Sequence, residues 1–246
     1  MYVDRRQTQL SDEFAAVDLQ QMQLARRYTD WVAGQIQPWC GPRILEVGAG
    51  TGNISSRLLR HAEYLCALEP NPACFETLRR TLDGAPGFEC RRWLIENCEL
   101  EFIASRHIDT IVCTNVLEHI EDEVAALQRL RAMLSGPAGR LVLVVPAVPA
   151  AYGSIDAALG HYRRYSGAHL RSVLDRAGFS IRSLRYSNAI GLVGWFFNAR
   201  VARRVQQSDA QIRIFDALIV PWYSQLERFV SPPLGLSLIA AADIER

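Results

Sequence analysis

The chain has 246 residues, 49% of them hydrophobic, which is enough apolar material for one sizeable α/β core. Its net charge of +1 creates no field suited to nucleic acid or an anionic membrane, so neither is expected as a partner. All 27 basic residues are arginine, which excludes a lysine Schiff base and a Walker-type phosphate-binding lysine.

The six cysteines form no C-x-x-C pair and no Cys/His spacing typical of a zinc site. We therefore expect neither a disulfide framework nor a metal ion. The first residues contain no apolar leader core, and no stretch approaches 18 apolar residues. A cytoplasmic protein is the expectation.

Residues 1–40 are predicted to be helical, because apolar side chains recur at helical spacing from Leu24 to Ile36, ahead of Pro38. This segment precedes the first predicted strand and is placed to cap a ligand crevice. Tyr28, on its apolar stripe, is a candidate contact for the substrate.

Residues 43–53 predict a strand, a tight turn and the start of a helix. Glycines at alternate positions allow positive φ and let the backbone approach a ligand closely. A dinucleotide fingerprint would place its third glycine where this chain has Asn53. Glu46, two residues before Gly48, would repel a pyrophosphate but suits a ligand that carries positive charge.

The run E-V-G-A-G-T-G resembles motif I of class I S-adenosylmethionine-dependent methyltransferases. The resemblance implies a Rossmann-like, doubly wound sheet of seven strands with helices on both faces, and S-adenosylmethionine as cofactor. In that family the loop holds the methionine part of the cofactor. The corresponding candidates here are Glu46, Gly48, Ala49, Gly50 and Asn53.

The second strand, residues 64–68, ends at Glu69 and Pro70, and Glu69 lies 21 residues after Gly48. A carboxylate at this place is expected to accept hydrogen bonds from both ribose hydroxyls. The third strand is predicted at residues 88–91. The family often places an acidic residue just beyond the third strand, where it contacts adenine, and this chain lacks that residue. Trp93 or Leu94 could pack on the adenine ring instead. Trp93 could equally be a core residue.

Residues 109–115 predict the fourth strand, and the following V-L-E-H-I resembles a signature of small-molecule methyltransferases of this class. Open α/β sheets bind ligands at the carboxyl ends of their strands, so Asn115 and Val116 are expected nearest the cofactor. Glu118 and His119 are expected to begin a helix and fix its turn, with His119 as a lesser candidate base.

The fifth strand, residues 140–146, is nearly continuous in apolar residues and fits burial on both faces. A helix over 166–177 with Ser166 as N-cap, a strand over 179–186 and a last strand over 236–240 complete the sheet. The last strand is expected to be inserted antiparallel.

The segment 151–165 is dense in polar aromatic residues and follows the fifth strand at its carboxyl end. Its G-H-Y-R-R-Y run is similar to a subgroup of the same family. Tyr152 and His161 are the catalytic candidates, His161 as general base because imidazole titrates near neutrality. Tyr165 could hydrogen-bond an acceptor, and Arg163 or its neighbour Arg164 could hold a carboxylate.

Residues 187–231 carry two apolar, aromatic-rich helical stretches that interrupt the sheet. They could form a lid over an apolar acceptor, a homodimer surface or ordinary packing against the sheet. We treat residues 1–246 as one domain with an N-terminal cap at 1–40 and this insertion.

The leading hypothesis is transfer of a methyl group to O, N or C of a small metabolite by in-line displacement. A rival reaction in the same fold converts S-adenosylmethionine itself to azetidine-2-carboxylate and methylthioadenosine, and the motifs alone do not exclude it. An NAD-dependent oxidoreductase is disfavoured by Asn53 and Glu46. A non-catalytic binding module is the remaining alternative, because a fold alone does not establish a reaction.

Overall fold

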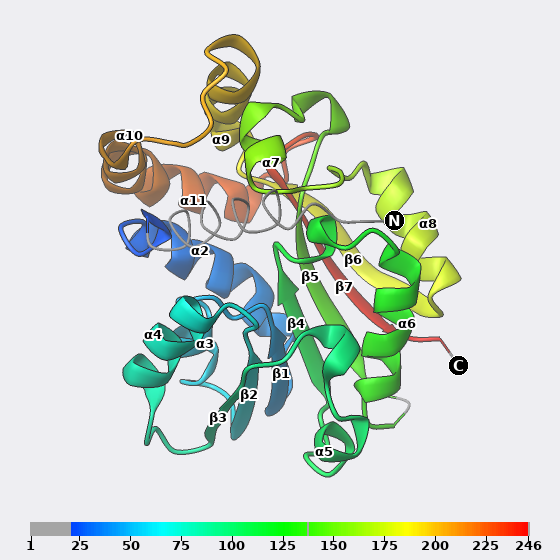
Figure 1. The fold of residues 1–246 in the computed structure, drawn as a ribbon. Helices are drawn as coiled ribbons and strands as arrows, with labels where there is room; N and C mark the ends of the chain where they lie inside the picture. The colour runs from blue at the N-terminus through cyan, green and yellow to red at the C-terminus, as the bar shows by residue number, and fades with distance from the viewer. Residues whose placement is uncertain (1–20, 137, 246) are drawn as a thin grey trace, which may run out of the picture.

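The computed structural model describes residues 21–136 and 138–245 and contains a seven-stranded mixed sheet in the order β3-β2-β1-β4-β5-β7-β6 (Figure 1). The strands are β1 (Arg43–Val47), β2 (Tyr64–Leu68), β3 (Phe88–Arg91), β4 (Thr110–Thr114), β5 (Arg140–Pro146), β6 (Phe179–Ser187) and β7 (Ser237–Ile244). β1 to β5 are parallel, and β7 lies antiparallel between β5 and β6. The predicted doubly wound sheet and its antiparallel last strand are confirmed.

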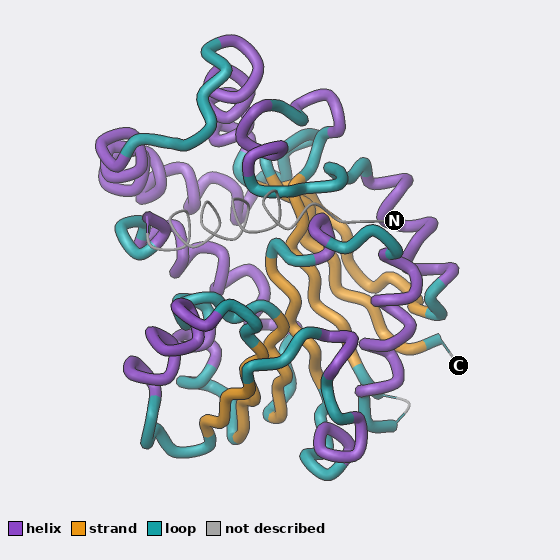
Figure 2. The backbone as a smooth tube through the Cα atoms, viewed as in Figure 1, coloured by secondary structure: helices purple, strands orange, loops and turns teal. Residues whose placement is uncertain are grey.

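Helices cover both faces of this sheet (Figure 2). The α-helices are α2 (Arg26–Ile36), α3 (Ser55–Leu58), α4 (Pro72–Leu82), α5 (Leu100–Ala104), α6 (Glu123–Met133), α7 (Ser154–Ala158), α8 (Gly167–Arg176), α9 (Ala189–Phe196), α10 (Asp209–Ile214) and α11 (Val220–Phe229). Single 3-10 turns are η1 (Gln37–Trp39), η2 (Ile95–Asn97), η3 (Leu117–His119) and η4 (Pro149–Ala151), and π turns are η5 (Phe197–Val201) and η6 (Phe215–Ile219).

Alternation along each strand divides the apolar side chains between two cores. Leu45 and Val47 of β1 pack in the core that α5, α6 and α8 complete. Ile44 packs in the other core, with side chains of α2, α3 and α4. Glu46 has the same strand parity as Ile44, so its carboxyl group lies on the face that α2 and α3 cover.

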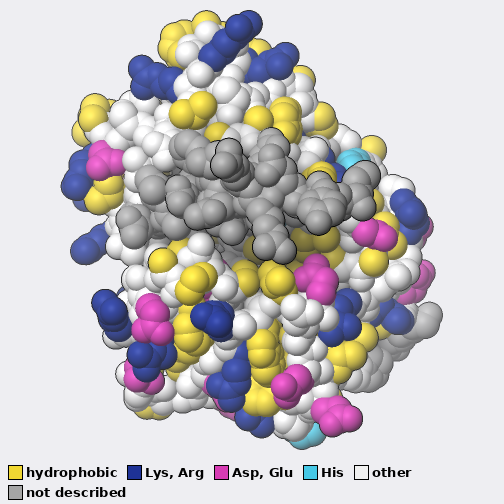
Figure 3. Space-filling view, in the orientation of Figure 1, with side chains coloured by type: hydrophobic (Ala, Val, Ile, Leu, Met, Phe, Trp, Pro, Cys, Tyr) yellow, Lys and Arg dark blue, Asp and Glu magenta, His cyan; other side chains and the backbone are white. Residues whose placement is uncertain are grey.

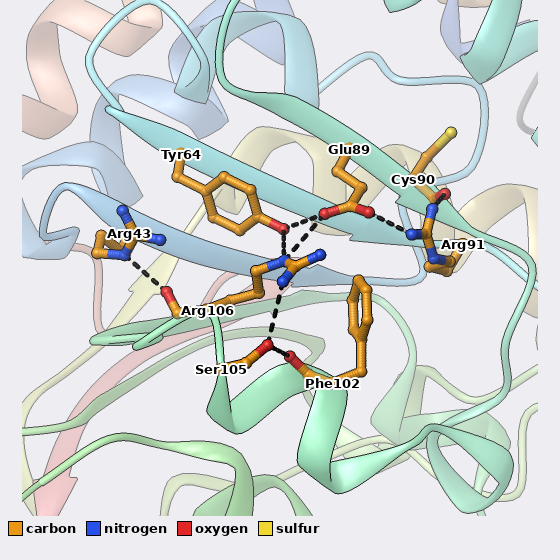
Figure 4. Close-up of polar contacts among 8 residues, drawn as sticks. All are labelled: Arg43, Tyr64, Glu89, Cys90, Arg91, Phe102, Ser105 and Arg106. Atoms are coloured by element: carbon orange, nitrogen blue, oxygen red, sulfur yellow. Dashed lines mark hydrogen bonds and ion pairs between the residues drawn. The ribbon is translucent and has the colours of Figure 1, made fainter.

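The edge strand β3 is tied to α5 by a polar cluster (Figure 4). The Glu89 carboxylate accepts hydrogen bonds from the Tyr64 hydroxyl at 2.5 Å and from Arg106 at 3.2 Å, and it also pairs with Arg91. The Arg106 guanidinium lies 4.2 Å from the centre of the Phe102 ring. Every polar group of this cluster has a partner, which assigns it to stabilising the sheet edge.

The structure corrects the boundaries of several predicted helices. Glu118 and His119 do not begin a long helix, because η3 is a single turn and α6 starts only at Glu123. The Asp122 side chain caps α6 by accepting the Ala125 N–H at 3.0 Å, which fixes that start. The segment 151–165 contains the unpredicted helix α7. The insertion does form two helical stretches, as predicted: α9 continues into η5, and α10 continues through η6 into α11.

The N-terminal cap is described from residue 21 onward, and residues 1–20 of the predicted segment 1–40 lie outside the described residues. α2 packs against the insertion through Tyr28, whose ring meets Phe215 edge-on at 6.4 Å, and through Trp31, which meets Tyr223 at 6.0 Å. Among the described residues, no helix has the length and apolar character needed to cross a membrane.

Candidate active site

The glycine turn after β1 has no room for a side chain at Gly48. Its φ is +71°, and a Cβ atom there would lie 2.2 Å from Cγ2 of Val116, beyond β4. The N–H groups of Gly48 and Ala49 both donate to the carbonyl of Leu68 in β2, at 2.9 and 3.0 Å. The ends of three neighbouring strands are therefore drawn together around the turn, and Gly50, also at positive φ, continues it.

Two buried acids border this turn. Glu46 is 2% exposed, and one of its carboxylate oxygens has no hydrogen-bond partner among the described residues. Burial, with a smaller contribution from the charge of Glu69, raises the pKa of Glu46 to about 8. A buried carboxyl oxygen without a partner, next to the glycine turn, fits a ligand that brings a cationic donor, as the ammonium of S-adenosylmethionine does.

Glu69 is held by the backbone on both sides. Its carboxylate accepts the N–H of Gly50 at 2.7 Å and that of Asn71 at 2.8 Å. Burial raises its pKa, and these two bonds oppose the shift. A carboxylate has about four acceptor positions, so two hydroxyl groups can still bind to it. Pro70, next in the chain, is exposed at the same edge.

The remaining cofactor candidates lie at different places around the turn. Asn115 is exposed at the end of β4 with φ +52°, and its N–H donates to the carbonyl of Val144 at 2.8 Å. Asn53 instead borders a groove of about 400 Å³ between α2 and α4. Trp93 is partly buried and packs against the core, edge-on to Phe102 at 5.3 Å, whereas Leu94 is 49% exposed beyond β3.

The segment 151–165 is organised by a buried residue that the sequence analysis did not single out, Asp156. Its carboxylate is fully buried and accepts the Nε–H of Arg164 at 2.7 Å and the Gly153 N–H at 2.9 Å. It also lies 3.0 Å from Nδ1 of His161 and 3.3 Å from the indole nitrogen of Trp195. Burial favours a raised pKa, but the contacts with His161, Arg164 and Gly153 outweigh it and lower the pKa of Asp156.

His161 faces the turn after β4. Three possible ligand atoms lie within 4.8 Å of one another here: a ring nitrogen of His161, a ring nitrogen of His119 and a carboxylate oxygen of Glu118. The two imidazole rings meet edge-on, with their centres 4.7 Å apart. Glu118 is fully buried, and neither of its carboxylate oxygens has a hydrogen-bond partner among the described residues. Burial raises the pKa of Glu118 to about 7, against the opposing effects of His161 and Arg164.

The other predicted residues of this segment hold the loop in place. The Tyr152 hydroxyl donates to the carbonyl of His161 at 2.7 Å. Arg163 donates to the carbonyls of Ile120 and Glu121, both at 2.8 Å, and pairs with Glu123. These bonds tie Arg163 to the start of α6.

Tyr165, Arg164 and Tyr28 are similarly engaged within the protein. Tyr165 is fully buried, and its hydroxyl donates to Glu123 at 2.7 Å. Arg164 does hold a carboxylate, as its guanidinium chemistry suggested, but that carboxylate belongs to Asp156. Tyr28 lies between α2 and the insertion, its N–H on Asp216 at 2.8 Å, and burial raises the pKa of its hydroxyl.

A strained residue introduces this loop. Val148, directly after β5, has φ +61°, a left-handed conformation that β-branched side chains rarely adopt. Its N–H donates to the carbonyl of Tyr165, and the neighbouring Ala147 carbonyl accepts Arg164 at 3.0 Å. The loop contacts therefore hold the chain in this conformation, next to the His161 cluster.

Comparison with known proteins identifies related chains. The family described as "Methyltransferase domain" matches residues 9–184. A ubiquinone biosynthesis O-methyltransferase of Xanthomonas axonopodis pv. citri is 27% identical over 125 residues, 50% of this chain and 51% of the relative. An uncharacterized methyltransferase of Mycobacterium tuberculosis is 29% identical over 106 residues, 43% of this chain and 51% of the relative. The chain thus spans about half the length of these curated relatives.

Solved structures show the same fold. An S-adenosylmethionine-dependent methyltransferase of Thermotoga maritima superimposes with a TM-score of 0.63 at 14% identity, covering 96% of this chain and 99% of the other. Magnesium protoporphyrin IX methyltransferase of Synechocystis, solved with bound S-adenosylmethionine, gives 0.54 at 15% identity and covers 89% of this chain and 79% of the other. Neither the self-cyclising nor the nicotinamide-dependent alternative gains support from these comparisons.

Proposed function

This chain belongs to the class I S-adenosylmethionine-dependent methyltransferases, and we propose that it methylates a small metabolite, most readily at an oxygen atom. Its curated relatives include O-methyltransferases of ubiquinone biosynthesis, which supports an oxygen acceptor ahead of nitrogen or carbon. S-adenosylmethionine, when bound, supplies a methyl group on a sulfonium, ready for in-line displacement. The protein must then position the acceptor, exclude water and remove its proton.

The observation that carries the proposal is the position of His161 relative to the glycine turn. Glu46 and Glu69 lie at the ends of β1 and β2, and the Glu118–His119–His161 cluster follows the end of the adjoining strand β4. Ligands of open α/β sheets bind along this edge. An acceptor bound at the cluster would therefore lie beside a cofactor held by the two acids.

We assign removal of the acceptor proton to His161. Asp156 holds its Nδ1 at 3.0 Å and Tyr152 holds its carbonyl at 2.7 Å, so the ring is fixed with Nε2 available. An imidazole oriented in this way by a buried carboxylate is a recurrent general base. Asp156 and Tyr152 are accordingly positioning residues.

The reaction is tested by incubating the purified protein with S-adenosylmethionine, with and without a metabolite extract, and measuring products by mass spectrometry. We expect S-adenosylhomocysteine only when the extract is present, together with a metabolite that gains one methyl group. Methylthioadenosine formed without any acceptor would instead establish self-cyclisation. Bound but unchanged cofactor in every extract would favour a non-catalytic binding module.

The raised pKa of Glu46 predicts that cofactor affinity depends on pH. The Glu46 carboxyl group must lose its proton before it can bind the ammonium of the cofactor as a carboxylate. Cofactor affinity should therefore rise by up to about tenfold per pH unit between pH 6 and 7.5. Titration calorimetry should show this slope in the native protein and a weaker, flatter dependence in Glu46→Gln. Glu63→Gln, at the exposed start of β2, is the control, and an equal slope in Glu46→Gln would contradict the assignment.

The same shift predicts a pH effect on stability in the absence of cofactor. The pKa of Glu46 is higher in the folded chain than its model-compound value of 4.5, so the folded state binds more protons between pH 4.5 and about 8. The free energy of unfolding should therefore fall as pH rises through this window. Glu46→Gln should remove that part of the decline, measured by denaturant titration.

We further infer that two copies of the chain associate through the helical insertion, with apolar side chains in contact. Figure 3 shows hydrophobic and arginine side chains side by side at the upper end of the molecule, over this insertion. Val193, Phe197, Leu218 and Phe229 of the insertion are 58 to 86% exposed, and a concentration of exposed apolar side chains in one segment is typical of an interaction surface. Light scattering should give twice the mass of one chain, and the Phe197→Ser/Phe229→Ser variant should give a single chain. A monomeric native protein would contradict the inference.

All six cysteines are unpaired, and four of them are buried. Unpaired thiols in this number fit a reducing compartment, and we infer a cytoplasmic location from them. Localisation of the tagged chain by fractionation tests this inference.

A further inference from the structure

Glu118 differs from the other buried carboxylates among the described residues, because both of its oxygens lack a partner, whereas Glu46 has one such oxygen. Glu227, also buried, accepts hydrogen bonds from the Ser187 hydroxyl and from two backbone N–H groups of the following residues, at 2.9 to 3.2 Å. Asp156 is fully satisfied as well. Glu118 is 0% exposed, yet both of its carboxylate oxygens are without a partner in the part of the chain that the structure describes. Burying a carboxylate in this way is costly unless a cation compensates it.

Two imidazole rings lie beside the Glu118 carboxylate, where they could serve as further ligands of a cation that compensates its charge. His119 and His161 each bring a ring nitrogen into the 4.8 Å set that includes a Glu118 oxygen. The backbone fixes this juxtaposition, because the N–H of Tyr162 donates to the Glu118 carbonyl at 2.8 Å. Residues more than 40 positions apart in the chain are thus joined directly at the cluster.

The surroundings of His161 match those of a metal-bound histidine. Metal-ligating histidines usually give their second nitrogen to a carboxylate, which orients the ring and raises its basicity. Here Asp156 takes Nδ1 at 3.0 Å, and Arg164 fixes Asp156 in turn at 2.7 Å. Nε2 of His161 has no partner among the described residues and is the nitrogen available to an ion.

We propose that Glu118, His119 and His161 bind a divalent transition-metal ion. One carboxylate oxygen and two imidazole nitrogens are ligands that suit Zn²⁺ and Mn²⁺ and leave coordination positions open. Ligand atoms about 2.0–2.2 Å from a shared ion lie roughly 3–4.4 Å apart. The exposed His119 ring can close the small remaining gap by rotating about its side-chain bonds.

A metal ion at this site would favour acceptors that carry a hydroxyl group, an inference that rests on the proposed function. An acceptor hydroxyl in an open position on the ion loses its proton to water more easily, because a bound cation lowers the pKa of the hydroxyl. Its oxygen then forms a bond to the methyl carbon while the carbon–sulfur bond breaks, and that electron pair stays on sulfur as S-adenosylhomocysteine forms. In the metal-bound protein Nε2 of His161 is a ligand of the ion, so water takes the acceptor proton in place of His161.

Metal binding is tested on the untagged full chain after removal of metals with a chelator. Titration calorimetry with ZnCl₂ and MnCl₂ should give one ion per chain, and Co²⁺ should produce a visible absorption band. His119→Gln and Glu118→Gln should each weaken binding at least about 100-fold, whereas His61→Gln, an exposed histidine elsewhere, should leave it unchanged. Because His119 is exposed, His119→Gln should fold normally, which circular dichroism checks.

The thermal transition of the same proteins gives a second readout. Glu118→Gln removes a buried charge, so without metal the midpoint temperature of its unfolding should be at or above that of the native chain. Addition of Zn²⁺ should not raise the midpoint temperature of this variant. Absence of stoichiometric binding, or binding that both substitutions leave intact, would overturn the metal site.

S-adenosylmethionine binding is measured on the same samples. If cofactor binds and no metal does, the site fails while the proposed function stands; if the cofactor does not bind, the proposed function fails.

Discussion

Glu69→Ala should weaken S-adenosylmethionine binding by about 100-fold or more. The carboxylate is held in one orientation by the N–H groups of Gly50 and Asn71, with two acceptor positions left at the cofactor edge. Hydrogen bonds to a charged group are each worth about 1.5–3 kcal/mol, and alanine removes two of them. It also leaves the Gly50 N–H without its partner, which loosens the glycine turn. Titration calorimetry with the cofactor measures the change.

The matched control is Glu63→Ala, at the opposite end of the same strand. Glu63 is exposed and contributes only its backbone N–H, to the Pro42 carbonyl at 2.8 Å, so cofactor affinity should stay within about twofold. Equal affinity in Glu69→Ala and the native chain would show that the cofactor ribose lies elsewhere. A loss of affinity that accompanies unfolding would appear in the circular dichroism spectrum and is thereby distinguished.

Asp156→Ala should lower the free energy of unfolding by about 3–5 kcal/mol. Arg164 is 3% exposed and pairs with Asp156 at 2.7 Å, so removing the carboxylate leaves a buried guanidinium charge without its counter-ion. Breaking a buried ion pair by deleting one partner has this order of cost. The same substitution frees His161 and the Gly153 N–H that begins α7. Urea titration followed by circular dichroism gives the value.

Asp175→Ala provides the comparison for this experiment, because Asp175 is exposed on α8 and should change stability by no more than about 0.5 kcal/mol. Asp156→Asn should fall between the two, since the amide oxygen can still accept one of the bonds while the charge is lost. A loss below about 1 kcal/mol in Asp156→Ala would show that Asp156 does not organise the loop.

The sheet could be predicted because its strands carry their own signal. β4 is buried at four of its five residues, and β5 is nearly continuous in apolar residues, follows Gly139 and ends at Pro146. Glycine spacing and the preceding acid located the turn at 48–52, and the structure shows the clash with Val116 that requires glycine at Gly48. The helix predicted at Glu118 was wrong, because the cap at Asp122 delays α6.

The interior of the site could not be predicted in the same way. Asp156 is buried on α7, a helix of five residues that is too short to show a periodic apolar pattern, and its partner Trp195 comes from the insertion. The Tyr162 N–H, which donates to the Glu118 carbonyl, helps to bring Glu118 and His161 together, and spacing along the chain does not encode this contact. Arg163 and Tyr165 look like ligand-binding side chains in the sequence, but Glu123 occupies both. Charged residues in loops acquire their roles from long-range partners.

A crystal structure of the chain with S-adenosylhomocysteine tests most directly whether the acids and the His161 cluster form one active site. We predict that the ribose hydroxyls bind Glu69, that the ammonium lies at Glu46, and that the sulfur faces the cluster of Glu118, His119 and His161. A cofactor seated in the groove beside Asn53, or a sulfur pointing away from the cluster, would contradict this account.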